Sequence, residues 1–290
     1  MRGAEPDLDA VAALVQEVAH GLVLPRFRDL SAGEISEKSP GDLVTAVDVE
    51  AERVLTARLA EIAPAVPVVG EEAVAADASL LGLLGRDGLA FVVDPIDGTR
   101  AFVEGDPDFA VMVALVDAGV PIASWIALPA HDELFTAARG AGAFVTRGSG
   151  SPERLLRADD AAVVGAPVDG PALAGSGRAL RGGVATAFLP DAERERVGAR
   201  VEALAPEVRG SARLWAGATY RRVLLGEDDF IVYWRTNAWD HAPGAVLIRE
   251  AGGIVQRWDG SDYRADDALT SLLVTASPGI AARVRTDLLV

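Results

Sequence analysis

The first half of the chain combines one helix-like apolar pattern with short apolar runs that are typical of buried strands. Apolar residues recur at helical spacing between Val47 and Ile62, with charged residues between them, and Pro64 follows. This spacing predicts a helix with one apolar face. The runs Val66–Val69 and Leu89–Val93 are short, apolar and followed by acidic or glycine residues. We interpret them as buried strands that bring acidic side chains to the edge of a sheet.

Further strands are expected before residue 150. The apolar stretch Phe109–Ala130 is interrupted near its middle by Asp117–Pro121, which contains a glycine and a proline. This pattern predicts a buried hairpin rather than a membrane-spanning helix. A second strand pair is predicted at Glu133–Arg139 and Ala143–Thr146, joined by a glycine-rich turn.

The polar turn Gly148–Pro152 is the best candidate for a boundary between two parts of the chain. We predict an N-terminal α+β subdomain over residues 1–148 and a C-terminal α/β subdomain over residues 149–290, in a protein of the α/β (α+β) class. The strands expected in the second part are Ala161–Gly165, Ile231–Trp234, Gly253–Trp258 and Ser271–Ala276. The helices expected there are Asp191–Leu204, Ala212–Leu225, Asp240–Ala251 and Pro278–Leu288.

Composition restricts the chemistry that the protein can perform. The 290 residues include 27 basic and 43 acidic side chains, giving a formal net charge of −16. Such a charge disfavours binding to nucleic acid or to an anionic membrane. There is no cysteine and there are three histidines, which excludes disulfides, thiolate zinc sites and cysteine nucleophiles. Any metal site must therefore be built mainly from oxygen ligands.

The N-terminal segment Met1–Leu24 contains several acidic residues. It lacks the basic start and the uninterrupted apolar core of a signal peptide. We therefore expect a soluble helix here, a cytoplasmic protein and no membrane partner.

The segment Asp94–Thr99, with the sequence Asp-Pro-Ile-Asp-Gly-Thr, carries the strongest chemical signal because it directly follows an apolar run. Two carboxylates three residues apart can face one cavity, and the Ile96 carbonyl between them is a third hard oxygen ligand, a plausible arrangement for Mg²⁺. Gly98 allows a ligand to approach the backbone, and a helix that begins near Thr99 would offer free N–H groups to a phosphate. The alternative is that both aspartates are ordinary turn formers.

An acidic pair and a lysine strengthen this interpretation slightly. Glu71 and Glu72 follow a second apolar run, although alone they would suggest a solvated loop. Lys38 is the one lysine in the sequence, whereas every other basic residue is arginine. Its retention hints at a site that needs a compact positive charge.

A third acidic position precedes a predicted helix. Asp240 occupies an expected N-cap position, with Pro243 in the first turn, and a capping role would satisfy it completely. The adjacent His241 could bind zinc, but no second histidine or cysteine lies nearby in the sequence. We therefore interpret His241 as a packing or hydrogen-bonding residue.

Four ordered motifs together resemble the inositol monophosphatase family, and they extend over most of the chain. The motifs are Lys38 with Asp42–Asp48, Gly70–Glu72, Asp94–Thr99, and Trp239–Gly253. The resemblance implies a five-layer α-β-α-β-α sandwich, usually a homodimer. It also implies hydrolysis of phosphate monoesters with two or three Mg²⁺ ions, commonly with sensitivity to lithium.

The resemblance also implies which residues bind the metal ions. By motif position, Glu71, Asp94 and the Ile96 carbonyl would hold one ion, and Asp94, Asp97 and Asp240 a second. A third, more loosely held ion would also use Glu71. A metal ion lowers the pKa of a bound water, and a second ion stabilises the leaving oxygen.

Other motif positions would act on the phosphate and the water. Gly98 and Thr99 would bind phosphate through backbone N–H groups. Thr99 together with Asp48 would orient or deprotonate the attacking water, and Lys38 would line the site. The carboxylates would repel a phosphate dianion without their cations and attract it with them.

Substrate selectivity in this family resides in the second half, where this sequence departs from the inositol-type pattern. The Gly-Ser/Thr-Ala segment of those members corresponds here to Leu214–Ala218, which contains Ala216, and their sugar-binding glutamate corresponds to Tyr233. Tyr233, Trp234 and Arg235 offer rings and a cation that would suit an aromatic or second anionic group. The two aromatic residues could equally belong to the core.

We therefore expect a phosphatase that acts on a small phosphorylated alcohol or sugar. The alternatives are a histidinol-phosphate phosphatase or a 3'-phosphoadenosine 5'-phosphate nucleotidase. A non-enzymatic alternative is a scaffold that binds metal or phosphate without catalysis.

Overall fold

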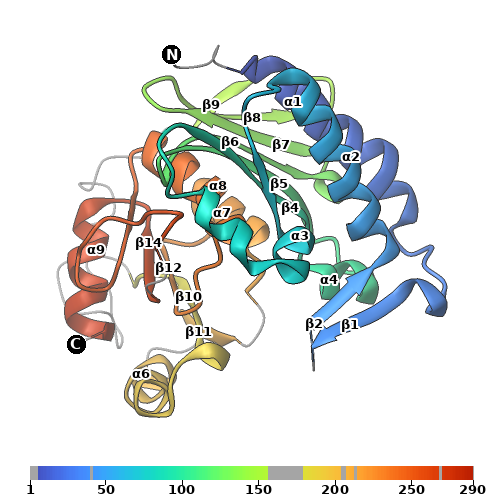
Figure 1. Ribbon diagram of the computed structural model, residues 1–290. Helices are drawn as coiled ribbons and strands as arrows, with labels where there is room; N and C mark the ends of the chain where they lie inside the picture. The colour runs from blue at the N-terminus through green and yellow to red at the C-terminus, as the bar shows by residue number, and fades with distance from the viewer. Residues whose placement is uncertain are drawn as a thin grey trace.

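The computed structural model describes residues 6–39, 42–155, 179–203, 207–211, 214–267 and 270–289. In this part of the chain, one sheet has seven strands, another has five, and two further strands form a separate hairpin. Helices cover both faces of each large sheet, so the layers alternate α-β-α-β-α (Figure 1). The predicted five-layer sandwich is therefore confirmed.

The larger sheet is built from strands that are neighbours both in sequence and in space, in the order β3-β4-β5-β6-β7-β8-β9. β3 and β4 are parallel, and all later neighbours are antiparallel. The strands are β3 Val68–Gly70, β4 Leu89–Asp97, β5 Ala110–Asp117, β6 Val120–Leu128, β7 Glu133–Ala138, β8 Gly142–Arg147 and β9 Glu153–Leu155. The two predicted strand pairs are thus present.

The central strands of this sheet are buried on both faces. Phe91 and Val93 of β4 pack with α1 (Leu8–Val18) and α2 (Ala46–Ile62), whereas Val92 packs on the opposite side with Ala242 of α8 (Ala238–Glu250). Because both faces of β4 are covered, its sequence is a continuous apolar run rather than an alternating one. This is the basis on which the strand could be predicted.

Helices α1 and α2 form the outermost layer next to this sheet. Among the described residues, the helical stretch Leu8–Arg26 is long and apolar enough, by length and composition, to cross a membrane. In the structure, its residues Val11 and Val15 are fully buried in the cluster that α1 forms with α2 and the sheet. The hairpin β1 (Ile35–Ser39) and β2 (Asp42–Thr45) leads into α2.

The smaller sheet has the order β11-β10-β12-β14-β13, with β10 parallel to both of its neighbours and β14 antiparallel to both of its own. Its strands are β10 Gly182–Ala185, β11 Val208–Ser211, β12 Phe230–Tyr233, β13 Ile254–Gln256 and β14 Leu272–Thr275. Helices α6 (Asp191–Ala203) and α9 (Pro278–Val284) pack on its outer side, and a π-helical turn, Arg285–Leu289, follows α9.

Two helices form the layer between the sheets. α7 (Ala216–Leu224) packs against α8, and α8 contacts the larger sheet on one side and β13 and β14 on the other (Figure 1). Both helices start near the end of β4, so their N-termini lie close to the acidic segment that β4 delivers.

Most predicted elements of the second half are present, with two differences among the described residues, and one prediction lies outside them. The predicted helix Ala212–Leu225 begins at Ala216 in the described residues. The strands β10 and β11 were not predicted, because each has four residues and contains glycine, which leaves no readable periodicity. The predicted strand Ala161–Gly165 lies outside the described residues.

Candidate active site

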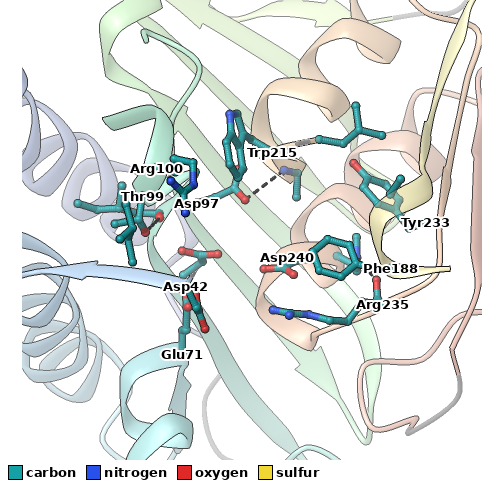
Figure 2. A pocket seen from close by; sticks show the side chains of 18 residues that line it. Asp42, Glu71, Asp97, Thr99, Arg100, Phe188, Trp215, Tyr233, Arg235 and Asp240 are labelled. Carbon is teal, nitrogen blue, oxygen red and sulfur yellow. Dashed lines mark hydrogen bonds between the residues drawn. The ribbon is translucent and has the colours of Figure 1, made fainter. Parts of the chain in front are cut away.

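A cleft with a volume of about 160 Å³ lies between the two sheets, at the end of β4 and at the N-termini of α7 and α8 (Figure 2). It brings together residues that are far apart in the sequence. Among the predicted site residues, the cleft is lined by Glu71, Asp94, Ile96, Asp97, Gly98, Thr99, Ala216, Tyr233, Arg235 and Asp240. The predicted residues Lys38 and Asp48 are not part of the lining but contact residues that are.

A β-bulge near the end of β4 places Asp94 and Asp97 on the same side of the sheet. Asp94 pairs with Met112 and Asp97 with Ala110, so two residues of β4 lie opposite one residue of β5. In a regular strand, side chains three residues apart point to opposite faces. The extra residue cancels that alternation and aims both carboxylates at the cleft.

The turn after β4 requires a glycine. Gly98 has a φ angle of 79°, and a Cβ atom there would lie 3.0 Å from the carbonyl oxygen of Asp108. Helix α4 (Thr99–Glu104) begins directly after it. The predicted helix start at Thr99 is therefore confirmed, and the backbone N–H groups of its first turn lie at the edge of the cleft.

Thr99 is linked to the buried carboxylate of Asp48. The Thr99 hydroxyl lies 3.0 Å from Oδ1 of Asp48 and 3.0 Å from the Ile96 carbonyl, and it can donate to either acceptor. The Oδ2 atom of Asp48 accepts bonds from the backbone N–H and the hydroxyl of Thr45, at 2.9 and 2.5 Å, in a capping box at the start of α2. Burial raises the pKa of Asp48 to about 6, although these bonds act in the opposite direction.

Asp97 is fixed by the N-terminus of α7. Its two carboxylate oxygens accept bonds from the backbone N–H groups of Ala216 at 3.1 Å and Gly217 at 2.7 Å. These N–H groups have no partner within their own helix, and they carry part of its positive dipole. Despite them, burial raises the pKa of Asp97 to about 7. Ala216, which we predicted as a substrate contact, thus holds Asp97 in place through its backbone N–H.

Asp240 is not the N-cap of α8, which corrects the sequence-based prediction. The N-cap residue is Asn237, the helix begins at Ala238, and Pro243 lies inside it. Asp240 is the third helical residue, where its carboxylate accepts a 3.1 Å bond from the Asn237 side-chain amide. Pro243 is the sixth helical residue, so it has no N–H to donate to the carbonyl of Trp239 one turn earlier, yet the helix continues through it.

The three aspartates form one compact cluster. Oxygen atoms of Asp94, Asp97 and Asp240 all lie within 4.8 Å of one another. The pKa of Asp94 is raised well above its ordinary value, first by burial and then by the neighbouring carboxylates Glu71, Asp97 and Asp240. For Asp240, burial and then Asp97 and Glu71 raise the pKa in the same way.

This cluster fits a hard divalent cation. Among the described residues, the buried Oδ1 atom of Asp94 has no hydrogen-bond partner. A buried carboxylate oxygen without a partner is costly, and a metal ion is one group that would satisfy it. Several carboxylates and the Ile96 carbonyl are the oxygen donors that Mg²⁺ prefers.

Glu71 and Glu72 begin α3 (Glu71–Ala76) on the other side of Asp94. Both form ion pairs with Lys38 of β1, with the Lys38 Nζ atom 2.7 Å from Oε1 of Glu71 and 2.6 Å from Oε1 of Glu72. Burial lowers the pKa of Lys38, but the two carboxylates outweigh this effect and raise it overall. The lone lysine of the sequence thus contacts Glu71 and Glu72 and is not part of the cleft lining.

Glu52 is part of this arrangement, and we had not predicted it. Its buried carboxylate accepts 2.8 Å bonds from the backbone N–H groups of Glu72 and Ala73, and so caps the N-terminus of α3. Gly70 makes room for it, since a Cβ atom there would lie 2.3 Å from the Glu52 carboxyl carbon. The available signal was the position of Glu52 one helical turn after Asp48, next to the apolar face of α2.

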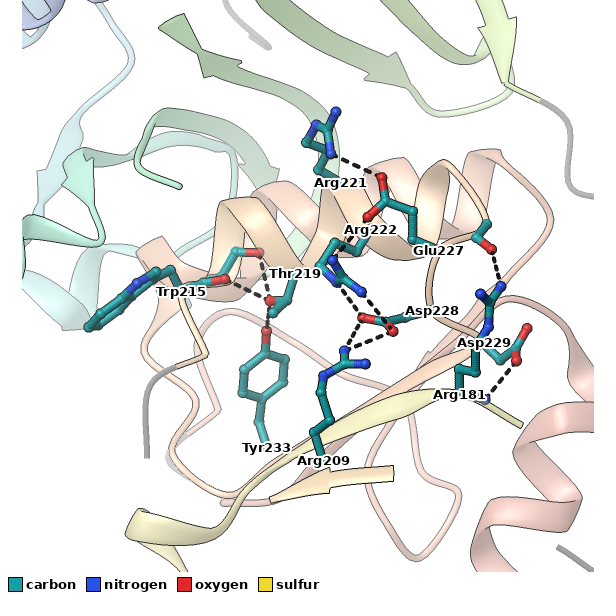
Figure 3. A network of polar contacts seen from close by, with 12 residues as sticks. Arg181, Arg209, Trp215, Thr219, Arg221, Arg222, Glu227, Asp228, Asp229 and Tyr233 are labelled. Carbon is teal, nitrogen blue, oxygen red and sulfur yellow. Dashed lines mark hydrogen bonds and ion pairs between the residues drawn. The ribbon is translucent and has the colours of Figure 1, made fainter. Parts of the chain in front are cut away.

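The opposite wall of the cleft is formed by the smaller sheet. Tyr233, at the end of β12, is buried, and its hydroxyl bonds to that of Thr219 in α7 (Figure 3). Trp234 packs edge to face on Trp258, with ring centroids 5.2 Å apart, and belongs to the core. Arg235 is exposed and lines the cleft.

An ion-pair network around a buried aspartate fixes the start of β12. Asp228, which is almost completely buried, accepts 2.8 Å bonds from Arg209 of β11 and Arg222 of α7 (Figure 3). Burial raises the pKa of Asp228, but the two guanidinium groups outweigh it and lower the pKa overall. The strand that ends at Tyr233 is therefore anchored to α7 at its beginning.

His241 has no free ring nitrogen for a metal. It is buried, with Nδ1 3.1 Å from the Tyr220 hydroxyl and Nε2 3.0 Å from the Arg235 carbonyl oxygen. Burial lowers the pKa of His241 to about 3, so the ring is neutral near pH 7. The predicted hydrogen-bonding role is therefore confirmed.

Comparison with known proteins agrees with this geometry. The model of the inositol monophosphatase family matches residues 5–288 of the chain. An inositol-1-monophosphatase from Mesorhizobium japonicum is 34% identical over 83% of this chain and 82% of its own length. A Nus factor SuhB from Xylella fastidiosa is 31% identical over 86% of this chain and 82% of its own length.

A solved structure, the extragenic suppressor protein suhB from Bartonella henselae, has the same fold. It superposes with a TM-score of 0.73 at 25% sequence identity and covers 97% of each chain. The family model and the relatives both extend over most of the chain, including both sheets and the cleft between them. The chain therefore belongs to the inositol monophosphatase family, and it is a phosphatase that hydrolyses phosphate monoesters.

Proposed function

We propose that the cleft is the catalytic site of a Mg²⁺-dependent phosphatase for a small phosphorylated alcohol or sugar. The observation that carries this proposal is the cluster of Asp94, Asp97 and Asp240, whose oxygens lie within 4.8 Å of one another beside the N-terminus of α4. Carboxylates at such distances repel one another and would repel a phosphate dianion. The arrangement is therefore useful only when cations neutralise it.

The proposed metal ligands follow the motif positions. Glu71, Asp94 and the Ile96 carbonyl would hold one Mg²⁺, and Asp94, Asp97 and Asp240 a second, with a third near Glu71. When bound, the cations neutralise charge on the phosphoryl group and lower the pKa of water. The bonds that Asp97 and Asp240 accept from α7 and Asn237 leave lone pairs of both carboxylates available for a cation.

The chain itself would position the phosphate and the water. The backbone N–H groups of Gly98 and Thr99 lie at the N-terminus of α4, where they can donate to phosphate oxygens. The Thr99 hydroxyl can accept a proton from the attacking water and donate its own to Oδ1 of Asp48, 3.0 Å away. A carboxylate with a pKa of about 6 is well suited to accept that proton near neutral pH.

The proposal extends to a homodimer in the cytoplasm that acts on small molecules rather than nucleic acid. The net charge of −16 supports the preference against nucleic acid. Light scattering coupled to gel filtration measures the oligomeric state. A monomer at micromolar concentration would refute the dimer without affecting the catalytic proposal.

The experiment that tests the function is phosphate release with Mg²⁺, and with EDTA as control. The panel is inositol 1-phosphate, histidinol phosphate, 3'-phosphoadenosine 5'-phosphate, fructose 1,6-bisphosphate and glycerol 2-phosphate. We expect metal-dependent release from at least one ester, and the preferred ester decides between the inositol-type, histidinol-phosphate and nucleotidase alternatives. Magnesium binding without hydrolysis of any ester would favour the scaffold alternative instead.

A further inference from the structure

Arg235 places a positive charge on the wall of the cleft that faces the acidic cluster. Its side chain is exposed to the cleft and reaches into it beside Asp240 (Figure 2). Among the described residues, no carboxylate lies within ion-pair distance of its guanidinium. Its charge acts on the neighbouring Asp240 carboxylate, whose pKa it lowers, but the two groups form no ion pair. The guanidinium is therefore available to bind a ligand.

The Arg235 guanidinium lies over an aromatic ring. Its central carbon lies 5.2 Å from the ring centroid of Phe188, in the short helical turn Thr186–Phe188 after β10. A guanidinium that contacts a ring through its flat face can still donate from its N–H groups, because these lie in its plane. Such an edge binds a carboxylate or a phosphate through two parallel hydrogen bonds.

The backbone that carries Arg235 is held on both sides, although it is not part of a helix or a strand. The Trp234 carbonyl accepts a 2.8 Å bond from the N–H of Ser271. The Thr236 hydroxyl accepts a 3.3 Å bond from the buried Arg257. The segment between β12 and α8 is therefore fixed by the core beneath it.

The carbonyl of Arg235 itself is anchored by His241. That carbonyl can only accept, so Nε2 of His241 must carry the proton, and Nδ1 must accept from the Tyr220 hydroxyl. The ring is buried and bonded at both nitrogens, so it holds the base of the Arg235 side chain at a defined place. The cation is thus pre-positioned, which reduces the entropy lost when a ligand binds.

We propose that the substrate carries a second anionic group, a carboxylate or a phosphate, and that Arg235 selects for it. This inference rests on the proposed function, because it assumes that the scissile phosphate lies near Gly98 and Thr99. The alcohol part of the ester then faces Tyr233, Phe188 and Arg235 on the opposite wall (Figure 2). An ester with a cationic alcohol, such as histidinol phosphate, would be repelled there.

Matched pairs of esters test this proposal. Glycerol 2-phosphate and 2-phosphoglycerate differ by a carboxylate, and glucose 1-phosphate and glucose 1,6-bisphosphate differ by a phosphate. We expect kcat/KM to be about 10- to 100-fold higher for the more anionic member of at least one pair, the value expected for a charge-assisted bidentate contact. The pair that shows the preference identifies the second group as carboxylate or phosphate.

Variants of Arg235 show whether this residue is the cause. In Arg235→Met, the ratio of kcat/KM within the preferred pair should fall to near one, and Arg235→Lys should restore part of it. The control is Arg53→Met, which removes the same charge at an exposed position of α2 outside the cleft. Added salt should reduce the wild-type ratio, because Arg235 is exposed and its charge is screened.

The outcomes separate this inference from the proposed function. The role of Arg235 would be overturned by equal kcat/KM values within both pairs, or by a preference that Arg235→Met retains. In either case, Mg²⁺-dependent hydrolysis of the esters would still support the proposed phosphatase. A preference for the less anionic member of each pair would also overturn the role of Arg235. No Mg²⁺-dependent hydrolysis of any ester would refute the proposed function, and the inference with it.

Discussion

Removal of divalent cations at neutral pH should destabilise the fold, because the cleft then contains buried carboxylates that repel one another. Burial raises the pKa of Asp48 from 3.8 to about 6 and that of Asp97 from 3.8 to about 7. In the unfolded chain both groups return to their ordinary pKa. Between about pH 4 and pH 7, the native state therefore binds more protons than the unfolded state, and the free energy of unfolding falls as the pH rises.

The pKa values set the size of this effect. A pKa difference of one corresponds to about 1.4 kcal/mol, so Asp48 alone lowers the free energy of unfolding by about 3 kcal/mol between about pH 4 and pH 8. Asp97 acts in the same direction. Both carboxylates interact with Glu71, so the two contributions are not additive. With about 2 °C per kcal/mol for a chain of this length, we expect the melting temperature to fall by about 5–10 °C.

The assay is thermal unfolding followed by circular dichroism, from about pH 5 to about pH 8, in EDTA and in saturating Mg²⁺. In EDTA the melting temperature should fall as the pH rises. In Mg²⁺ the fall should be smaller or reversed, because the cation binds the deprotonated carboxylates of the native state. A melting temperature in EDTA that is flat or rises with pH, or curves that coincide in the two buffers, would refute the reasoning.

Three further substitutions test individual contacts. Asp94→Asn should reduce turnover, measured by phosphate release, by at least about 10³-fold, while circular dichroism shows an unchanged fold. The control Asp191→Asn, at an exposed position of α6, should keep full activity. Wild-type turnover in Asp94→Asn would argue against a metal role for Asp94. Glu52→Gln should lower the free energy of unfolding, measured in urea, by about 1–3 kcal/mol. Each carboxylate oxygen of Glu52 accepts a bond from one backbone N–H, and the glutamine amide replaces one of these acceptors with a donor. An unchanged midpoint of the urea transition would contradict this. Gly98→Ala should lower the free energy of unfolding by about 1–2 kcal/mol, because the φ angle is left-handed and the added Cβ atom would lie 3.0 Å from the Asp108 carbonyl oxygen. A variant as stable as the wild type in the same urea assay would mean that the turn adjusts to the added atom.

The features that were predictable from the sequence are those encoded by neighbouring residues. The segment Asp94–Thr99 directly follows a buried apolar run and combines two carboxylates, a glycine and a helix start within six positions. Each of these signals has a local physical cause, and the family motifs then link the segment to Glu71 and Asp240. The strand, the turn and the cluster could therefore be derived before the structure was known.

The features that were not predictable depend on contacts between distant parts of the chain. Asp97 binds the N-terminus of α7, 119 residues away in sequence. Glu52 caps α3, and its partners lie 20 and 21 residues further along the chain. In the sequence, the one signal is its position next to the apolar face of α2, and the packing of α2 on α3 is what buries it. Its role could not be read from its neighbours alone.

The inner helix layer has a consequence for how this enzyme could change over evolutionary time. Asp94, Asp97 and Asp240 come from the larger sheet and from α8, which packs directly on that sheet. Tyr233, Arg235 and Phe188 belong to the smaller sheet and its loops. With the roles proposed above, the reaction and the choice of substrate are encoded by different layers of one molecule. Mutations in the second set would then alter which ester enters while the hydrolytic residues stay intact.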